Sequence, residues 1–149
     1  MKKIYLAGYD VFYPDAAERG QAMKQLCKRY GFEGLYPLDN EAQSAQEILA
    51  GNLKLIEEAD IVMANMNPFR GMEPDSGTAF EVGYAVAKGK RIYVYLEDCR
   101  TLRQKIGETD ARGFAVEDFS LPLNLMIACS AVVVEGGLED CLRRTKAGE

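Results

Sequence analysis

The sequence predicts an α/β fold in which a flavodoxin- or Rossmann-like parallel sheet of about five strands is flanked by helices. Short apolar runs of strand-forming residues alternate along the chain with longer segments of helical periodicity. This alternation is typical of parallel sheets joined by right-handed crossovers. A length of 149 residues suits one domain, and 48% hydrophobic residues are ample for a core. We therefore expect residues 1–149 to form a single domain.

The first strand is predicted at residues 3–7, an apolar run that ends at Gly8. We expect it to be a central strand, followed by a sharp turn or a close approach to a ligand at the glycine. A helix is predicted at residues 15–30, where apolar residues recur at near-helical spacing until Gly31 stops the pattern. Residues 32–38 are predicted as the second strand, with a proline marking its end or an edge position.

The next helix begins at a Ser-Ala-Gln-Glu capping box and is predicted at residues 44–59. Gly51 in its middle costs about 0.5–1 kcal/mol relative to alanine. The glycine therefore indicates either a kink or a helix face that lies close to another group. Strands are predicted at residues 61–64 and 91–96, and between them a glycine- and proline-rich loop leads into a helix at residues 78–87.

Residues 97–119 are polar and lack clear periodicity, which is typical of a lid, an arm or a binding loop. A short helix is predicted at residues 121–129, with Pro122 in its first turn. A last strand at residues 131–134 and a closing helix at residues 138–144 complete the predicted fold.

The composition excludes several classes of site. The chain has no histidine, which rules out His-based catalytic triads and His-ligated metals. Its four cysteines lie without a C-x-x-C pair, so neither a zinc site nor a disulfide framework is indicated. We expect no bound metal and reduced thiols in a cytoplasmic protein, with Cys27 and Cys129 buried.

The charge and the glycine pattern limit the partners and cofactors. A net charge of −5 argues against a nucleic-acid polymer or an acidic membrane surface as partner. No apolar segment reaches the length of a membrane span. No complete dinucleotide-binding or P-loop glycine pattern is present, so we expect neither a nicotinamide nor an ATP cofactor.

The loop after the third predicted strand carries the candidate site. In open α/β sheets, ligand sites form where a strand, a glycine-bearing loop and the start of a helix meet. Asp75 lies in this loop, and Glu81 lies within about the first turn and a half of the helix. The positive end of a helix dipole can keep a carboxylate ionised, which would make Glu81 a candidate nucleophile. The simpler alternative is that Asp75 only caps the helix and Glu81 is solvated.

Four segments of the chain resemble, in the same order, segments of the nucleoside 2-deoxyribosyltransferase family. They are Ile4-Tyr-Leu-Ala-Gly8 with Phe12, Asn52 with Ile56-Glu-Glu-Ala-Asp-Ile61, Asp75-Ser-Gly-Thr-Ala-Phe-Glu-Val-Gly-Tyr-Ala85, and Leu123-Asn-Leu-Met126. The resemblance spans nearly the whole chain. It implies N-glycosidic chemistry on a deoxynucleoside and a free nucleobase, without a cofactor.

The resemblance implies a role for each matching position. Glu81 corresponds to the nucleophile of the family, Asp75 to the carboxylate that contacts the base, and Tyr5 to the tyrosine that holds the nucleophile. Gly8 and Phe12 correspond to residues that line the base pocket, where the Phe12 ring would stack on the base.

Further candidate substrate-binding residues have more open roles. Asn124 corresponds to an asparagine donated across a subunit interface to the sugar, which implies an obligate homo-oligomer, a dimer or higher. Asn52 falls where some family members carry an aspartate, which leaves the base preference open. Phe69, Arg70 and Gly77 belong to the signature loop and its helix. Arg70 suits three roles: binding a 5′-phosphate, covering the pocket, or pairing with a nearby glutamate.

The expected reaction is transfer of a 2-deoxyribosyl group between nucleobases. Glu81 would attack the anomeric carbon to form a covalent glutamyl–sugar intermediate, and Asp75 would assist the departing base if burial or the charge of Glu81 raises its pKa. If water replaces the second base, the protein is instead a hydrolase of 2′-deoxynucleosides or their 5′-monophosphates. A second alternative is a non-catalytic sensor domain that binds a nucleotide derivative in the same pocket.

Overall fold

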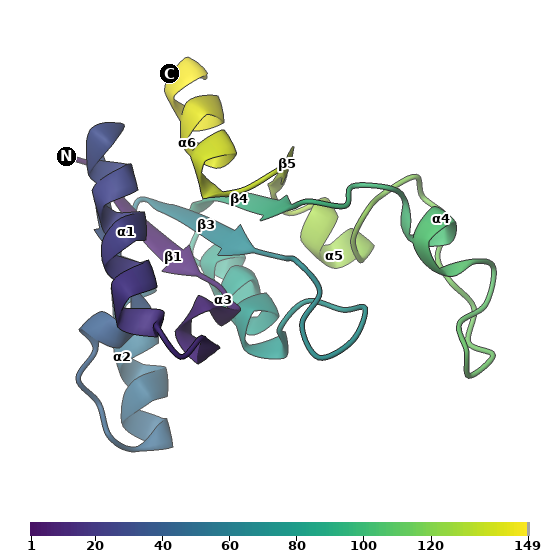
Figure 1. Ribbon diagram of the computed structural model, residues 1–149, viewed down its shortest axis with the longest axis horizontal. Coiled ribbons are helices and arrows are strands. Elements are labelled where there is room, and N and C mark those ends of the chain that lie inside the picture. The colour runs from purple at the N-terminus through teal and green to yellow at the C-terminus, as the bar shows by residue number, and fades with distance from the viewer. Residues whose placement is uncertain (149) are drawn as a thin grey trace.

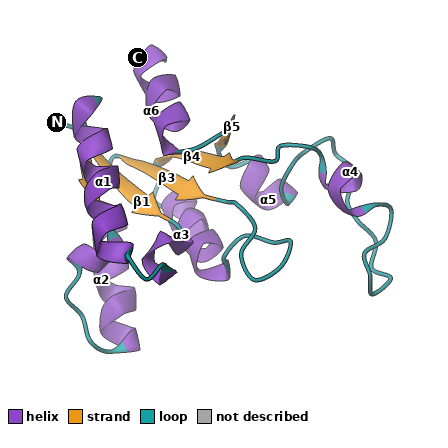
Figure 2. Cartoon of the chain, in the orientation of Figure 1, coloured by secondary structure: helices purple, strands orange, loops and turns teal. Residues whose placement is uncertain are grey.

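The computed structural model describes residues 1–148, so the predicted domain boundary at residue 149 lies outside the described part. Five parallel strands form one sheet in the order β2-β1-β3-β4-β5 (Figures 1 and 2). The strands are β1 (Lys3–Ala7), β2 (Glu33–Leu35), β3 (Ile61–Asn65), β4 (Arg91–Leu96) and β5 (Val132–Glu135). The predicted α/β fold is confirmed, and β1 is an interior strand as expected.

Helices cover both faces of the sheet. One face packs on α1 (Ala16–Arg29) and α6 (Leu138–Ala147), through a cluster that includes Ile4 and Leu6 of β1. The other face packs on α2 (Ala45–Glu58), α3 (Ser76–Ala87) and α5 (Leu125–Ala128). Successive side chains of a strand point to opposite faces, so Tyr5, between Ile4 and Leu6, points toward α2 and α3.

The strand order places the candidate site. The chain crosses from β1 to the β2 edge and then returns past β1 to β3, so the connections that leave β1 and β3 run in opposite directions along the sheet. In this flavodoxin-like order, ligands bind at the switch point between β1 and β3, beyond the carboxyl ends of the strands. The loop before the short 3-10 helix η1 (Tyr9–Phe12) and the loop before α3 both begin at that point.

Three sequence predictions are corrected by the structure. The second strand ends at Leu35 rather than residue 38, because the chain turns into a second 3-10 helix, η2 (Pro37–Asp39), with proline in its first turn. The helix predicted at residues 121–129 begins only at Leu125, so Pro122 precedes it. Cys129, predicted to be buried, is exposed because it is the C-cap of this four-residue helix, whereas Cys27 is buried as predicted.

Residues 97–119 form an arm that extends away from the sheet (Figure 1). The arm contains a short helix, α4 (Leu102–Ile106), which the sequence did not predict and which begins with a Thr101–Gln104 capping box. No helix within residues 1–148 is long and apolar enough to cross a membrane.

Candidate active site

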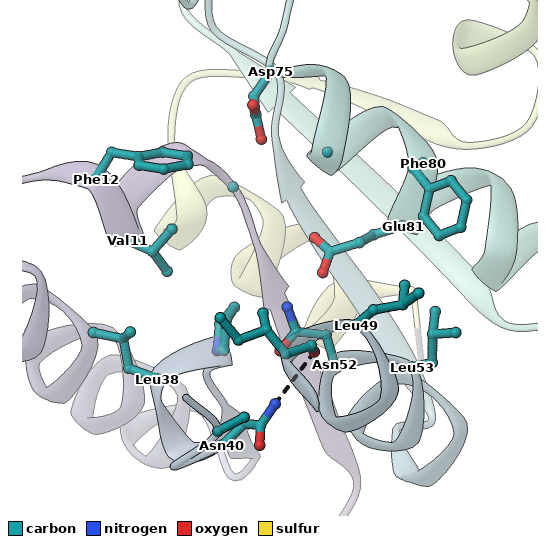
Figure 3. A pocket seen from close by; sticks show the side chains of 15 residues that line it. Val11, Phe12, Leu38, Asn40, Leu49, Asn52, Leu53, Asp75, Phe80 and Glu81 are labelled. Carbon is teal, nitrogen blue, oxygen red and sulfur yellow. Dashed lines mark hydrogen bonds between the residues drawn. The ribbon is translucent and has the colours of Figure 1, made fainter. Parts of the chain in front are cut away.

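A cavity of about 510 Å³ opens at the carboxyl ends of β1 and β3 (Figure 3). Its walls come from η1, the segment around η2, α2 and the first half of α3. Six residues predicted from the sequence line it: Gly8, Phe12, Asn52, Asp75, Gly77 and Glu81. These six residues come from three segments of the chain, and the segment around η2 adds a fourth.

Glu81 projects from α3 into the cavity and receives a hydrogen bond from the Tyr5 hydroxyl of β1. Asn52 of α2 directs its amide nitrogen toward the same carboxylate (Figure 3). The pKa of Glu81 is raised to about 7 by the sum of four influences: burial raises it most, the hydrogen bond from Tyr5 lowers it, the nearby charge of Asp75 raises it, and the hydrogen bond from Asn52 lowers it. The sequence predicted an environment that keeps this carboxylate ionised, but Glu81 lies more than a turn from the helix N-terminus and burial dominates.

Tyr5 has no exposed surface and lies in the core below the cavity floor. Burial, and then the charge of Glu81, raise the pKa of its hydroxyl well above the ordinary value for tyrosine. The hydroxyl is therefore protonated at all physiological pH values and remains a hydrogen-bond donor to Glu81.

Asp75 lies across the cavity from Asn52 and points toward Glu81 (Figure 3). Its Oδ2 accepts hydrogen bonds from the backbone N–H of Thr78 at 3.0 Å and from the Thr78 hydroxyl at 2.7 Å. Asp75 is thus the N-cap of α3, as the simpler sequence alternative held, and it also lines the cavity. Because both of these bonds fall on Oδ2, Oδ1 is the oxygen left for a ligand.

Gly8 allows the chain to turn tightly between β1 and η1. Its φ angle is 156°, and a Cβ atom there would lie 2.8 Å from both Asn65 Cβ and Asp10 Oδ1. The buried Asp10 is hydrogen-bonded by Asn65 at 3.2 Å and ion-paired with Arg19 at 3.1 Å. These contacts fix η1, and with it Phe12, against the end of β3.

An aromatic cluster forms the outer rim of the cavity. The Phe69 ring stacks on Phe12 with a centroid distance of 5.4 Å and on Tyr9 with a distance of 4.9 Å. The Arg70 guanidinium lies 4.4 Å from the Phe69 centroid and 5.1 Å from that of Phe12. Phe69 and Arg70 therefore contact the wall of the cavity from outside and do not line it, which favours the covering role for Arg70 among the three roles it suited.

Asn124 does not reach the cavity of its own chain. It is the exposed N-cap of α5, and its side-chain oxygen accepts a hydrogen bond from the Met126 backbone N–H at 2.9 Å. Donation of this residue to a neighbouring subunit stays a prediction.

Sequence reasoning missed one side of the cavity. Apolar side chains of α2 and the segment before it supply much of the lining, together with one asparagine and a phenylalanine of α3: Leu38, Asn40, Ile48, Leu49, Leu53 and Phe80. The spacing of Ile48 and Leu49 continues the pattern of Leu53 and Ile56, so the sequence did not separate them from the core; only the structure shows that each is nearly half exposed. Within residues 1–148, no group of three or more Asp, Glu, Cys or His side chains is arranged to hold a metal ion.

Comparisons with known proteins identify the family of this chain. The family model of nucleoside 2-deoxyribosyltransferases matches residues 4–126. A 2-deoxyribosyltransferase from Leishmania mexicana is similar in structure with a TM-score of 0.90 and 38% identity, over 99% of this chain and 98% of that one. A CMP N-glycosidase from Clostridium botulinum shares the fold, with a TM-score of 0.57 and 18% identity over 99% and 100% of the two chains.

An uncharacterized Schizosaccharomyces pombe protein, C191.05c, is 33% identical over 69% of this chain, which spans about half (54%) of that protein's length. The family match covers most of the chain and includes the segments that carry Tyr5, Asp75 and Glu81. The chain therefore belongs to the nucleoside 2-deoxyribosyltransferase family.

Proposed function

We propose that residues 1–149 act as one domain that transfers a 2-deoxyribosyl group from a deoxynucleoside to a free nucleobase through a covalent intermediate on Glu81. The observation that carries this proposal is the placement of Glu81, whose buried carboxylate is hydrogen-bonded by Tyr5 on the floor of a mostly apolar cavity with Asp75 nearby. Two carboxylates around one cavity provide the pair of groups that retaining glycosyl transfer requires.

In the first half of the reaction, a carboxylate oxygen of Glu81 attacks C1′ as the C1′–N bond to the base breaks. The base leaves with one proton, which Asp75 takes up from solvent on Oδ1 and passes to a ring nitrogen of the base. Tyr5 donates its hydrogen bond to Glu81 throughout and orients the attacking oxygen. In the second half, a nitrogen of the incoming base attacks C1′, the ester bond to Glu81 breaks, and the base gives one proton to Asp75, which returns it to solvent.

The lining of the cavity favours a nucleoside over a nucleotide. Among the described residues that line the cavity there is no lysine or arginine, but there are two carboxylates, Asp75 and Glu81. A 5′-phosphate placed inside would therefore meet two carboxylates without a compensating cation, which is unfavourable at low dielectric. Arg70, over the Phe12 ring at the rim, is the cation that could bind a 5′-phosphate. A nucleoside monophosphate could therefore react here only if its phosphate projected out of the cavity past Phe12.

Assembly into a homo-oligomer is part of the proposal. α3 is apolar on its outer face as well as on the face that packs on the sheet, and a helix that is apolar all round is normally buried. Phe80 and Val86 of α3 are exposed, and α5 beside it exposes Met126 at 72%. A second copy packed on this surface would bury these side chains and bring its own Asn124, which precedes α5, toward the cavity.

The direct test is base exchange. Purified protein is incubated with thymidine or deoxyadenosine and a second free base, and products are separated by liquid chromatography. A new deoxynucleoside that requires both the acceptor base and Glu81, with Glu81→Ala as the matched control, is the expected result. Free deoxyribose formed regardless of acceptor would make the protein a hydrolase. Ligand binding that survives Glu81→Ala, with no turnover of nucleosides or monophosphates, would make it a binding module.

If each active site combines Glu81 of one subunit with Asn124 of another, two inactive variants should restore activity when their subunits are mixed. Glu81→Ala and Asn124→Ala are each expected to be inactive alone. After the two proteins are dissociated, mixed and reassociated as dimers, about a quarter of the active sites would contain neither substitution if subunits pair at random. Activity that stays at zero after mixing, with mixed dimers demonstrated, would exclude donation of Asn124 across the interface.

A further inference from the structure

Asn40 sits directly against the backbone of α2 at Gly51. Its side-chain nitrogen donates to the carbonyl oxygens of Glu47 and Ile48, each at 3.3 Å. A Cβ atom on Gly51 would lie 1.8 Å from that nitrogen, so no other residue at position 51 leaves room for the contact. Of the two alternatives for this mid-helix glycine, the helix face that lies close to another group is therefore the correct one.

The contact holds one wall of the cavity. The segment of residues 37–42 contributes Pro37, Leu38, Asn40 and Ala42 to the lining. Figure 3 shows Leu38 and Asn40 on the side of the cavity away from Asp75, with the hydrogen bond from Asn40 reaching α2.

The other polar contacts of the 37–42 wall are made by Asp39, and they connect it to Tyr36 and to α1 instead of α2. The Tyr36 backbone N–H donates to the Asp39 carboxylate at 2.9 Å, and Lys24 of α1 forms an ion pair with the same carboxylate. Asn40 is the residue of the wall whose side chain hydrogen-bonds to α2. Loss of that contact would therefore separate the wall from α2 without releasing η2 from α1.

The position of the contact links it to the reaction. Asn40 and Asn52 both line the cavity into which Glu81 projects, so a gap between Asn40 and α2 would open into that cavity. Leu38 of the 37–42 wall and Ile48 and Leu49 of α2 form an apolar lining on this side of the cavity, and all three are already partly exposed. Water that entered here would reach the sugar ester while the acceptor base is absent or arriving.

We propose that Asn40 and Gly51 are positioning residues that set the acceptor specificity of this site, favouring a nucleobase over water by holding the 37–42 wall against α2. The proposal rests on the proposed transferase function. In hydrolysis, the oxygen of water attacks C1′, the C1′–O bond to Glu81 breaks, and one water proton is released, which leaves deoxyribose and the free carboxylate. Transfer and hydrolysis share the same ester, so their ratio reports only which acceptor reaches it.

The experiment compares Asn40→Ala, Gly51→Ala and the control Ala50→Gly, which lies on the exposed side of α2. Deoxyribose and exchanged nucleoside are quantified together at saturating acceptor base, and the ratio of hydrolysis to transfer is the readout. We expect both contact variants to raise this ratio about five- to tenfold, the effect of losing one hydrogen-bonded contact. Ala50→Gly lowers the helix propensity of α2 at the residue next to Gly51 without touching Asn40, so we expect it to leave the ratio of hydrolysis to transfer unchanged.

Two features separate this role from a loss of stability. Gly51→Ala replaces a helix breaker by the best helix former, so helix propensity alone would make the variant more stable. If the contact acts as one unit, the double variant Asn40→Ala/Gly51→Ala raises the ratio no more than either single change.

Unchanged ratios in both single variants, or ratios that multiply in the double variant, would overturn the proposal while leaving the transferase function intact. Absence of base exchange in the unsubstituted protein would instead remove the proposed function.

Discussion

Replacement of Glu81 by glutamine is expected to stabilise the protein at neutral and higher pH while it abolishes turnover. Burial raises the pKa of this carboxyl from 4.5 to about 7, so ionising it within the cavity is unfavourable. The rise corresponds to a penalty of about 3 kcal/mol on the ionised form, an upper value because the side chain is only partly buried. E81Q removes this penalty and keeps the size of the side chain.

The sign of the pH dependence follows from proton binding. Between pH 4.5 and about 7, the folded state keeps a proton on Glu81 that the unfolded chain has released. The free energy of unfolding therefore falls as the pH rises through this window, and the loss is complete above it. We expect the stability of E81Q minus that of the parent to be near zero at acidic pH and to grow to about 2–3 kcal/mol above neutral pH.

The introduced amide has partners available. Tyr5 donates to one carboxylate oxygen and would donate equally to an amide oxygen. Asn52 Oδ1 is buried and has no hydrogen-bond partner in the described structure, and a rotation of the Asn52 amide would let it accept from the new NH₂ group. Because that rotation would bury Asn52 Nδ2 where Oδ1 now lacks a partner, the expected stabilisation of about 2–3 kcal/mol is an upper value.

Urea denaturation of both proteins from about pH 4 to about pH 8 measures this difference. The matched control is Glu58→Gln, which changes an exposed carboxylate of α2 and should give a nearly pH-independent difference. If E81Q were no more stable than the parent above neutral pH, or if the difference did not depend on pH, burial would not be the dominant influence on Glu81. The acid limb of the parent's pH–rate profile should have its midpoint near the same pH of about 7.

Three further predictions concern the residues around Glu81. Tyr5→Phe removes a hydrogen bond that lowers the pKa of Glu81, so the acid limb of the pH–rate profile should move above 7; an unchanged midpoint would refute this. Asp75→Asn and Asp75→Ala should both lose base exchange, but only the alanine variant should lose the α3 cap and about 1 kcal/mol of stability in denaturation experiments. Phe12→Ala should raise KM for the deoxynucleoside by up to about tenfold with a smaller change in kcat, and a change confined to kcat would argue against stacking.

The layers of the fold could be predicted because each element carries a local signal. The five apolar runs became the five strands, and the Ser44 capping box opened α2 one residue later, with its side chain accepting from the Glu47 N–H. The elements that were predicted wrongly are those whose ends depend on a single residue or a short cap and not on a repeating apolar pattern. Pro37 turned the chain into η2, and the capping box at Thr101 produced α4 inside a polar stretch without periodicity.

The candidate site was predictable in its residues more than in its chemistry. Tyr5 and Glu81 are 76 positions apart, and no pattern within either segment indicates that they meet; the family resemblance alone implied it. The expectation of an ionised Glu81 came from the helix N-terminus, a local effect, whereas burial by α2 and β1 is a tertiary effect that raises the pKa. Asn40 was missed for the same reason, because its partner Gly51 becomes meaningful only once the two are packed together.

In the proposed reaction, the mostly apolar cavity places two opposing requirements on Glu81. Exclusion of water protects a sugar ester from hydrolysis, but it also raises the pKa of the carboxylate that must attack. A lysine or arginine beside Glu81 would lower that pKa, yet it would hold the carboxylate in an ion pair and weaken it as a nucleophile. The neutral donors Tyr5 and Asn52 instead oppose part of the rise in the pKa of Glu81 without pairing its charge. Hydrogen bonds from neutral groups therefore meet both requirements of the proposed reaction better than a cation would.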